Sequence, residues 1–146
     1  MKVSALKGEQ NSGKTTTLSL LRKIMVGKAG FTEDFSTLID LHKGDFRVIL
    51  ERDGKKIGIV SQGDYAINVG DKVSVKSHLD YMKGQGCEVV VCACTTGETK
   101  RKIFDAIEDY APQREYVHKR KSNRESEDED NKCCAKTIFN MLQNMN

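Results

Sequence analysis

The chain has 146 residues, of which 38% are hydrophobic and 31% charged, and its formal net charge is +3. That length accommodates one domain with a real core but not two, so we expect a single domain over residues 1–146. The small positive charge gives no indication of nucleic acid or an anionic membrane as a partner.

Targeting features are also missing from the sequence. No apolar run approaches the roughly 18 residues that a membrane-spanning helix needs, and MKVSALKGEQ lacks the apolar stretch of a signal peptide. The five cysteines are an odd number without a secretory context. We therefore expect a cytoplasmic protein with reduced thiols and no membrane partner.

The first third of the chain predicts a strand, a helix and an irregular segment. A short strand over residues 2–7 precedes a helix over 14–26, in which Leu18, Leu21 and Met25 recur with helical spacing. Residues 28–43 mix Gly, Thr and Asp with isolated apolar residues, and most of them are expected to form a loop.

A β-hairpin follows. In FRVILERDGKKIGIV, residues 46–60, the pair Asp53-Gly54 separates two β-rich runs and favours a type I′ turn. The second arm, residues 57–60, is apolar except for Gly58, which predicts a strand covered on both faces.

The second half of the chain alternates helices and strands. A helix carrying Val75, Leu79 and Met82 leads to a buried strand over residues 89–94. Thr95 and Glu98 then have the spacing of a capping box before a helix with Ile103 and Ile107, and a short strand near 116–117 follows. Residues 119–131 are basic and then acidic and predict a solvated loop. The final helix carries an apolar stripe of Ala135, Ile138, Phe139, Leu142 and Met145.

This alternation predicts an α/β protein with a three-layer fold, whose sheet is mostly parallel with one antiparallel hairpin strand. Right-handed crossovers bring the C-terminal ends of parallel strands to one edge of a sheet. Open α/β folds bind their ligands at that edge.

The segment GEQNSGKT, residues 8–15, matches the pattern G-x-x-x-x-G-K-[ST]. Its glycines let backbone N–H groups converge on one anion, and the helix that follows adds its positive end. Lys14 is suited to the β- and γ-phosphates, and the Thr15 hydroxyl to Mg²⁺. The expected phosphate-binding residues are Gly8, Glu9, Gln10, Asn11, Ser12, Gly13, Lys14, Thr15 and Thr16.

Because this motif follows a predicted strand and opens a predicted helix, the chain resembles the P-loop NTPase superfamily over residues 2–26. The resemblance implies a P-loop NTPase-like fold and a nucleoside triphosphate bound with Mg²⁺. It also implies an acidic residue near the end of a second buried strand. Asp64, in Ser61-Gln62-Gly63-Asp64 after the strand over 57–60, is the candidate.

We expect Lys14 and Asp64 to be catalytic, and Thr15 and Asp64 to hold Mg²⁺, with Asp64 acting through a water molecule. Two alternatives stay open: Ser61 contacts a metal-bound water, or Asp64 only caps a turn.

The nucleotide base is less constrained by the sequence. The hairpin before the second core strand is similar to that of small GTPases, but Ser61–Asp64 is not D-x-x-G, and no N-K-x-D follows the strand over 89–94. We therefore expect ATP ahead of GTP. Weaker candidates for contacts with nucleotide or transferred phosphoryl group are Thr95, Thr96, Lys100, Arg101, Arg114, Arg120 and Arg124.

The expected function is Mg²⁺-dependent hydrolysis of a nucleoside triphosphate. The alternatives are a small-molecule or nucleotide kinase that transfers the γ-phosphoryl group, and a non-catalytic module in which nucleotide orders residues 28–43 and 61–70. Nucleic acid is not expected, because the KRK run at 119–121 has one nearby aromatic residue and an acidic run directly after it. Scattered histidines and the lack of C-x-x-C argue against a zinc site.

Overall fold

A computed structural model describes residues 1–143, which form a six-stranded sheet and four α-helices. The strands are β1 (Lys2–Gly8), β2 (Thr32–Asp40), β3 (Phe46–Arg52), β4 (Lys55–Val60), β5 (Val89–Thr95) and β6 (Arg114–His118). The helices are α1 (Lys14–Lys28), α2 (Val75–Gly84), α3 (Arg101–Glu108) and α4 (Glu127–Gln143), with a 3₁₀ turn, η1 (His42–Gly44), before β3.

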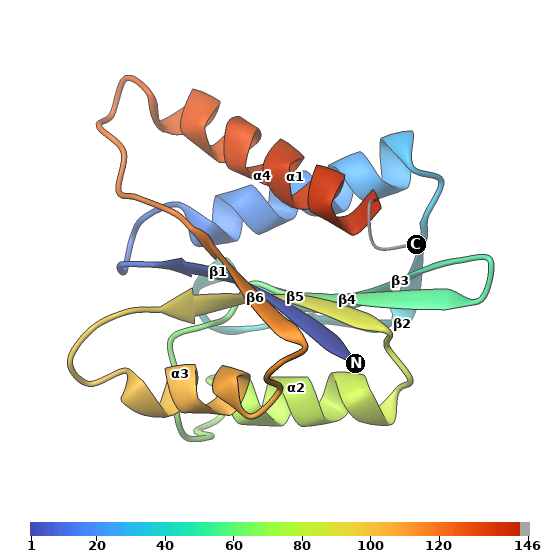
Figure 1. The fold of residues 1–146 in the computed structure, drawn as a ribbon, viewed down its shortest axis with the longest axis horizontal. Helices are drawn as coiled ribbons and strands as arrows, with labels where there is room; N and C mark the ends of the chain where they lie inside the picture. Colours follow the sequence, from blue (N-terminus) through green and yellow to red (C-terminus); the bar gives the residue numbers. More distant parts are fainter. Residues whose placement is uncertain (144–146) are drawn as a thin grey trace.

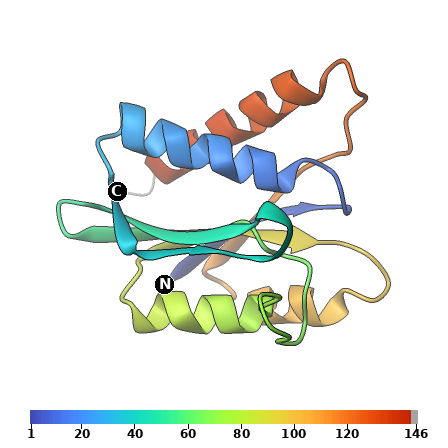
Figure 2. The same cartoon turned by 180° about the vertical axis from the view of Figure 1, so that it is seen from behind.

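The strand order is β2-β3-β4-β5-β1-β6. β1 is parallel to β5 and β6, and β4 is parallel to β5, whereas β3 is antiparallel to both of its neighbours. Helices α1 and α4 cover one face of the sheet, and α2 and α3 cover the other (Figures 1 and 2). The α/β class and a mostly parallel sheet in which one strand runs against the rest are thus confirmed.

The buried core has two halves because strand side chains alternate between the two faces of the sheet. Leu6 and Ile59 pack with α1 and α4, whereas Ala5 and Val60 pack with α2 and α3. Both faces of β4 are therefore covered, as its apolar sequence predicts. The hairpin prediction is confirmed as well, since Asp53 and Gly54 have φ values of 53° and 79°, as a type I′ turn requires.

The prediction of a loop over residues 28–43 is wrong for most of that segment, because β2 occupies Thr32–Asp40. This strand forms one edge of the sheet, is largely exposed, and contains an irregularity between Asp34 and Ile39. There the Thr37 hydroxyl accepts a hydrogen bond from the Ile49 amide at 2.9 Å, in place of a backbone partner. A half-exposed edge strand with a bulge leaves no regular apolar alternation for sequence analysis to detect.

The solvated loop expected over residues 119–131 is partly wrong. α4 begins at Glu127, and its acidic first turn suits the positive end of the helix. Lys119 and Asn131 are buried rather than solvated. The expected stripe of α4 is observed as far as Leu142, while Met145 lies outside the described residues.

The C-terminal ends of β1, β4, β5 and β6 meet at one edge of the sheet, from which the connections to α1, α3 and α4 leave (Figure 1). Hydrogen bonds extend the pairing beyond the strands there. The Thr96 amide donates to Gly8 O at 3.0 Å, and the Lys119 amide donates to Lys7 O at 2.8 Å. The segments that follow β5 and β6 are therefore held against the end of β1, at the edge where ligand binding is expected. Among residues 1–143, no helix has both the length and the apolar character needed to cross a bilayer.

Gly63 provides a test of this edge. A Cβ atom at Gly63 would lie 2.3 Å from Ala93 O in β5, and that backbone has little freedom to move. We predict that Gly63→Ala lowers the free energy of unfolding by about 1–3 kcal/mol, measured by denaturant titration. The matched control is Gly84→Ala at the end of α2, where a Cβ meets nothing within 4 Å. The control is expected to be neutral or stabilising by up to about 1 kcal/mol, and equal losses in both variants would contradict the prediction.

Candidate functional site

The turn between β1 and α1 is closely enclosed by distant segments. Asn11 and Gly13 have φ values of 61° and 89°, which turn the backbone sharply before α1. A Cβ at Gly8 would lie 2.5 Å from Lys119 O, and one at Gly13 would lie 2.5 Å from the Asn131 Oδ1 atom of α4. Glycine is therefore required at both positions by close approach.

Among residues 1–143, no side chain caps the N-terminus of α1. Its N-cap residue, Gly13, makes no side-chain capping hydrogen bond, and its first turn contains no acidic residue. The first amides of a helix have no partners within the helix, and they carry the positive end of its dipole. This end of α1 is suited to an anion.

Lys14 lies at the same place and is only 7% exposed. Its Nζ atom donates hydrogen bonds to Gly8 O at 3.1 Å and Glu9 O at 2.6 Å. Burial lowers the pKa of Lys14, and the nearby carboxylates of Asp64 and Asp45 partly oppose that shift. The ammonium group thus has no direct ion pair among residues 1–143, and phosphate oxygens would be better partners than the two carbonyls.

Asp45 is a site residue that the sequence analysis missed. It immediately precedes β3 and is 7% exposed. Its Oδ1 atom accepts hydrogen bonds from the hydroxyls of Thr15 at 2.8 Å and Ser61 at 2.9 Å. Burial raises the pKa of Asp45, and the two hydroxyl donors act in the opposite direction. These bonds join the start of α1 to the ends of β3 and β4.

Asp64 lies in the same hollow. Its Oδ1 atom accepts a hydrogen bond from the Thr95 hydroxyl, and its backbone oxygen accepts one from Lys100 Nζ at 2.8 Å. The capping box expected at Thr95 and Glu98 is wrong, because α3 begins only at Arg101 and its N-cap, Lys100, makes no side-chain capping bond. Thr95 and Lys100 instead hold Asp64 in place.

Together these groups surround a polar hollow of about 320 Å³. Of the expected phosphate-binding residues, residues 10–16 line this hollow. Gly8 and Glu9 contact Lys14 instead, because their carbonyl oxygens accept hydrogen bonds from its Nζ atom. Thr96 faces a neighbouring hollow, Arg101 lies near Asp105, and Arg114 pairs with Glu108. The other residues that line the hollow are Lys43, Asp45, Ser61, Asp64 and Glu127.

The donor set of this hollow is suited to Mg²⁺. Thr15, Asp45, Ser61 and Asp64 supply oxygen atoms only. In residues 1–143 no three His, Cys, Asp or Glu side chains gather around one point. Mg²⁺ in proteins takes one or two carboxylates together with waters and substrate phosphates, so two carboxylates and a hydroxyl fit it.

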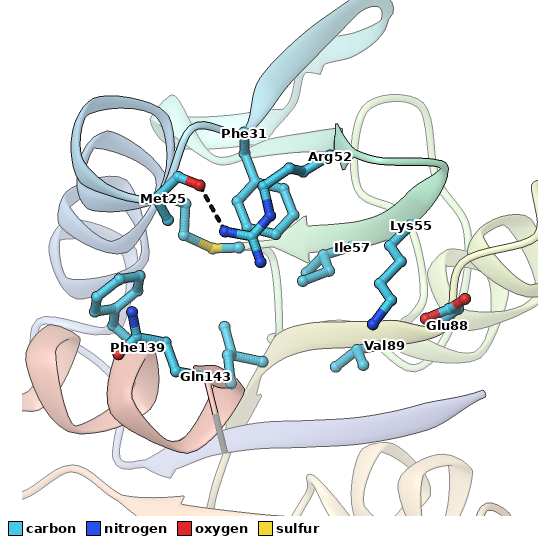
Figure 3. A pocket seen from close by; sticks show the side chains of 11 residues that line it. Met25, Phe31, Arg52, Lys55, Ile57, Glu88, Val89, Phe139 and Gln143 are labelled. Atoms are coloured by element: carbon cyan, nitrogen blue, oxygen red, sulfur yellow. Dashed lines mark hydrogen bonds between the residues drawn. The ribbon is translucent and has the colours of Figure 1, made fainter. Parts of the chain in front are cut away.

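A second cavity lies at the opposite edge of the sheet, near the beginnings of β4 and β5 (Figure 3). Arg52 lies over the Phe31 ring at 4.6 Å and donates to Ala29 O at 2.6 Å, which fixes one wall. The volume of this second cavity is about 60 Å³, whereas sites for small-molecule ligands are roughly 300–1,000 Å³. The cavity is therefore too small for a nucleotide.

Comparison of the chain with protein-family models, with curated proteins and with solved structures gives no match in any of the three searches.

The contact between Gly13 and Asn131 provides a test of the turn. Asn131 is 2% exposed and its Oδ1 also accepts a hydrogen bond from the Thr17 hydroxyl at 3.4 Å. Gly13→Ala is predicted to lower the free energy of unfolding by roughly 1–3 kcal/mol, through both the clash and the positive φ.

A double-mutant cycle with Asn131→Ala separates these two contributions. Removing the Asn131 side chain relieves the clash but not the backbone strain, so we expect a coupling free energy of at least about 0.5 kcal/mol between the two sites. Strict additivity would show that α4 does not restrain the turn.

Proposed function

We propose that the protein binds a nucleoside triphosphate, with ATP expected ahead of GTP, in the hollow formed by residues 8–16, and hydrolyses it with Mg²⁺. We further propose that its fold is that of a P-loop NTPase. The observation that carries both is the uncapped N-terminus of α1, which lies beside the buried Lys14 at the end of a parallel strand.

The phosphate groups are bound by backbone and by charge. Residues 10–16 line the hollow, and the positive end of α1 favours an anion there. Lys14 exchanges its hydrogen bonds with Gly8 O and Glu9 O for charge-assisted ones to the β- and γ-phosphates. This exchange places the ammonium group where negative charge develops during transfer.

Thr15 and Asp45 would hold the metal ion directly, and Asp64 would hold it through a water molecule. When bound, Mg²⁺ neutralises charge on the phosphates and orients the γ-phosphoryl group. The Thr15 hydroxyl would offer an oxygen lone pair to the metal while it donates its hydrogen bond to Asp45 Oδ1, as the 2.8 Å contact allows. Asp64, fixed by Thr95 and Lys100, orients the attacking water and accepts its proton.

Two alternatives are retained. Transfer to a second substrate uses the same phosphate groups and needs only an acceptor in place of water. A non-catalytic, nucleotide-dependent module is favoured by Ile67 and Val69, which are 66% and 59% exposed in the segment that links Asp64 to α2. Phosphate release from ATP alone supports hydrolysis, turnover only after adding an acceptor supports a kinase, and binding without turnover supports the module.

Lys14→Ala tests the phosphate site. ATP with Mg²⁺ at 100 times its dissociation constant should raise the free energy of unfolding of the unmodified protein by about 2.7 kcal/mol, visible as a thermal shift. Lys14→Ala is expected to abolish that shift, because the charge that faces the phosphates is removed. Lys28→Ala, an exposed lysine at the other end of α1, is the control and should keep it. An equal shift in Lys14→Ala would refute the proposed site.

Asp45→Asn and Asp64→Asn separate metal binding from turnover. In Asp45→Asn the new amide oxygen still accepts the hydroxyls of Thr15 and Ser61, so we expect a folded protein whose nucleotide affinity no longer increases with Mg²⁺. In Asp64→Asn, phosphate release is expected to fall by roughly 100-fold or more, since the proton acceptor is lost. Asp80→Asn on the exposed face of α2 is the control. Unchanged Mg²⁺ dependence in Asp45→Asn would remove Asp45 from the metal site.

A further inference from the structure

Another hollow, here called the basic hollow, lies beside the phosphate site at the same edge of the sheet. It has a volume of about 320 Å³ and shares Gly8 and Glu9 with the turn that holds Lys14. Three strands contribute to it through their ends and the connections that follow. Its other residues are mostly cationic: Lys7, Thr96, His118, Lys119, Arg120 and Lys121.

The segment after β6 is built so that two of these cations are available. Lys119 is buried, its amide donates to Lys7 O, and its Nζ atom donates to Arg120 O at 3.1 Å and Ser122 Oγ at 3.4 Å. Arg120 and Lys121 are exposed, and neither forms an ion pair with a carboxylate of residues 1–143. Lys119 therefore anchors the backbone that presents Arg120 and Lys121.

A second basic group, Lys100, Arg101 and Lys102, reaches the same edge from β5. Both connections, β5–α3 in yellow and β6–α4 in orange, leave this edge in Figure 1. The acidic run of residues 127–130 belongs to α4, which lies with α1 on the opposite face from α3. Asp130 of that run lines a further hollow together with Arg120 and Lys121, and Arg101 lies 4.0 Å from Asp105, so the basic groups are only partly neutralised by carboxylates.

Two aromatic rings lie beside Lys7, next to the residues that line the basic hollow. Phe104 of α3 and Tyr116 of β6 stack with their centroids 5.6 Å apart and their planes inclined by 17°. Lys7 Nζ lies 4.7 Å from the Phe104 centroid and 5.2 Å from that of Tyr116. Both rings are half-buried, and β6, which carries Tyr116, is an edge strand of the sheet. Residues 7, 104 and 116 are far apart in sequence, so only the fold reveals this cluster.

We propose that single-stranded nucleic acid binds across the basic hollow, with its phosphates on Arg120 and Lys121 and its bases against Phe104 and Tyr116. Cationic grooves combined with aromatic rings are the means by which proteins bind single strands. A duplex keeps its bases stacked away from such rings, and an acidic peptide gains nothing from them.

The test is fluorescence anisotropy of fluorescein-labelled oligo(dT) and oligo(U), without nucleotide, on the full chain. Arg120→Glu/Lys121→Glu is expected to weaken binding by at least about tenfold and to reduce the slope of log K against log salt by about 2. Lys23→Glu/Lys28→Glu, exposed on α1, makes the same charge change away from the hollow and should retain binding. Lys14→Ala should also retain it, so strand binding is measured independently of the nucleotide site.

Several results would overturn the proposal: no binding at low salt, equal losses in the two charge-reversed variants, or equal affinity for a duplex of the same length. Displacement of the strand by AMP or by polyglutamate at matched phosphate or carboxylate concentration would also overturn it, by assigning the hollow to a mononucleotide or an acidic peptide. A thermal shift with ATP in Arg120→Glu/Lys121→Glu shows that the variant is folded and that the phosphate site is intact.

Discussion

The absence of side chains at Gly8 and Gly13 is the constraint on which this edge of the molecule depends. At Gly8 the backbone of Lys119 closes over the end of β1, and at Gly13 the Asn131 side chain of α4 packs against the start of α1. These contacts bring the β6–α4 connection and α4 onto the β1–α1 turn. A turn enclosed in this way has little freedom to move, which favours a preorganised site for the anion that we propose.

Charge is concentrated in that volume at a cost in stability. Lys14 and Asp45 are both nearly buried, and burial moves the pKa of each in the direction of its neutral form. The hydroxyls of Thr15 and Ser61 recover part of the cost by donating to Asp45. Charged groups that are buried in this way are more typical of binding sites than of cores, and this supports the phosphate site that we propose.

Sequence reasoning succeeded where local rules decide the structure. The period of α1, the Asp53-Gly54 turn and the apolar strands β4 and β5 follow from residue patterns that need no distant partner. It failed at β2, whose edge position removes the alternation, and at Asp45, whose importance arises from side chains at positions 15 and 61. The only local signal for Asp45 is its position between the turn η1 and the strand β3. Many surface turns place an Asp at such a position, so this signal does not distinguish a site residue. The prediction that Lys119 and Asn131 are solvated fails for the same reason, because their burial depends on contacts with Gly8 and Gly13.

The strand order accounts for the unusual position of Asp64. β5 lies between β4 and β1, so the tip of β4 is two strand spacings, or about 10 Å, from the strand that leads to Lys14. Ser61, directly after the apolar run of β4, lines the side of the phosphate hollow where Asp45 lies and donates a hydrogen bond to it. Gly63 passes against the Ala93 backbone, and the following residue then meets Thr95 at the tip of β5. Gln62 and Gly63 therefore carry the chain from Ser61 to the end of β5, where Asp64 lines the hollow. Asp45 reaches the same hollow from the antiparallel strand on the other side of β4.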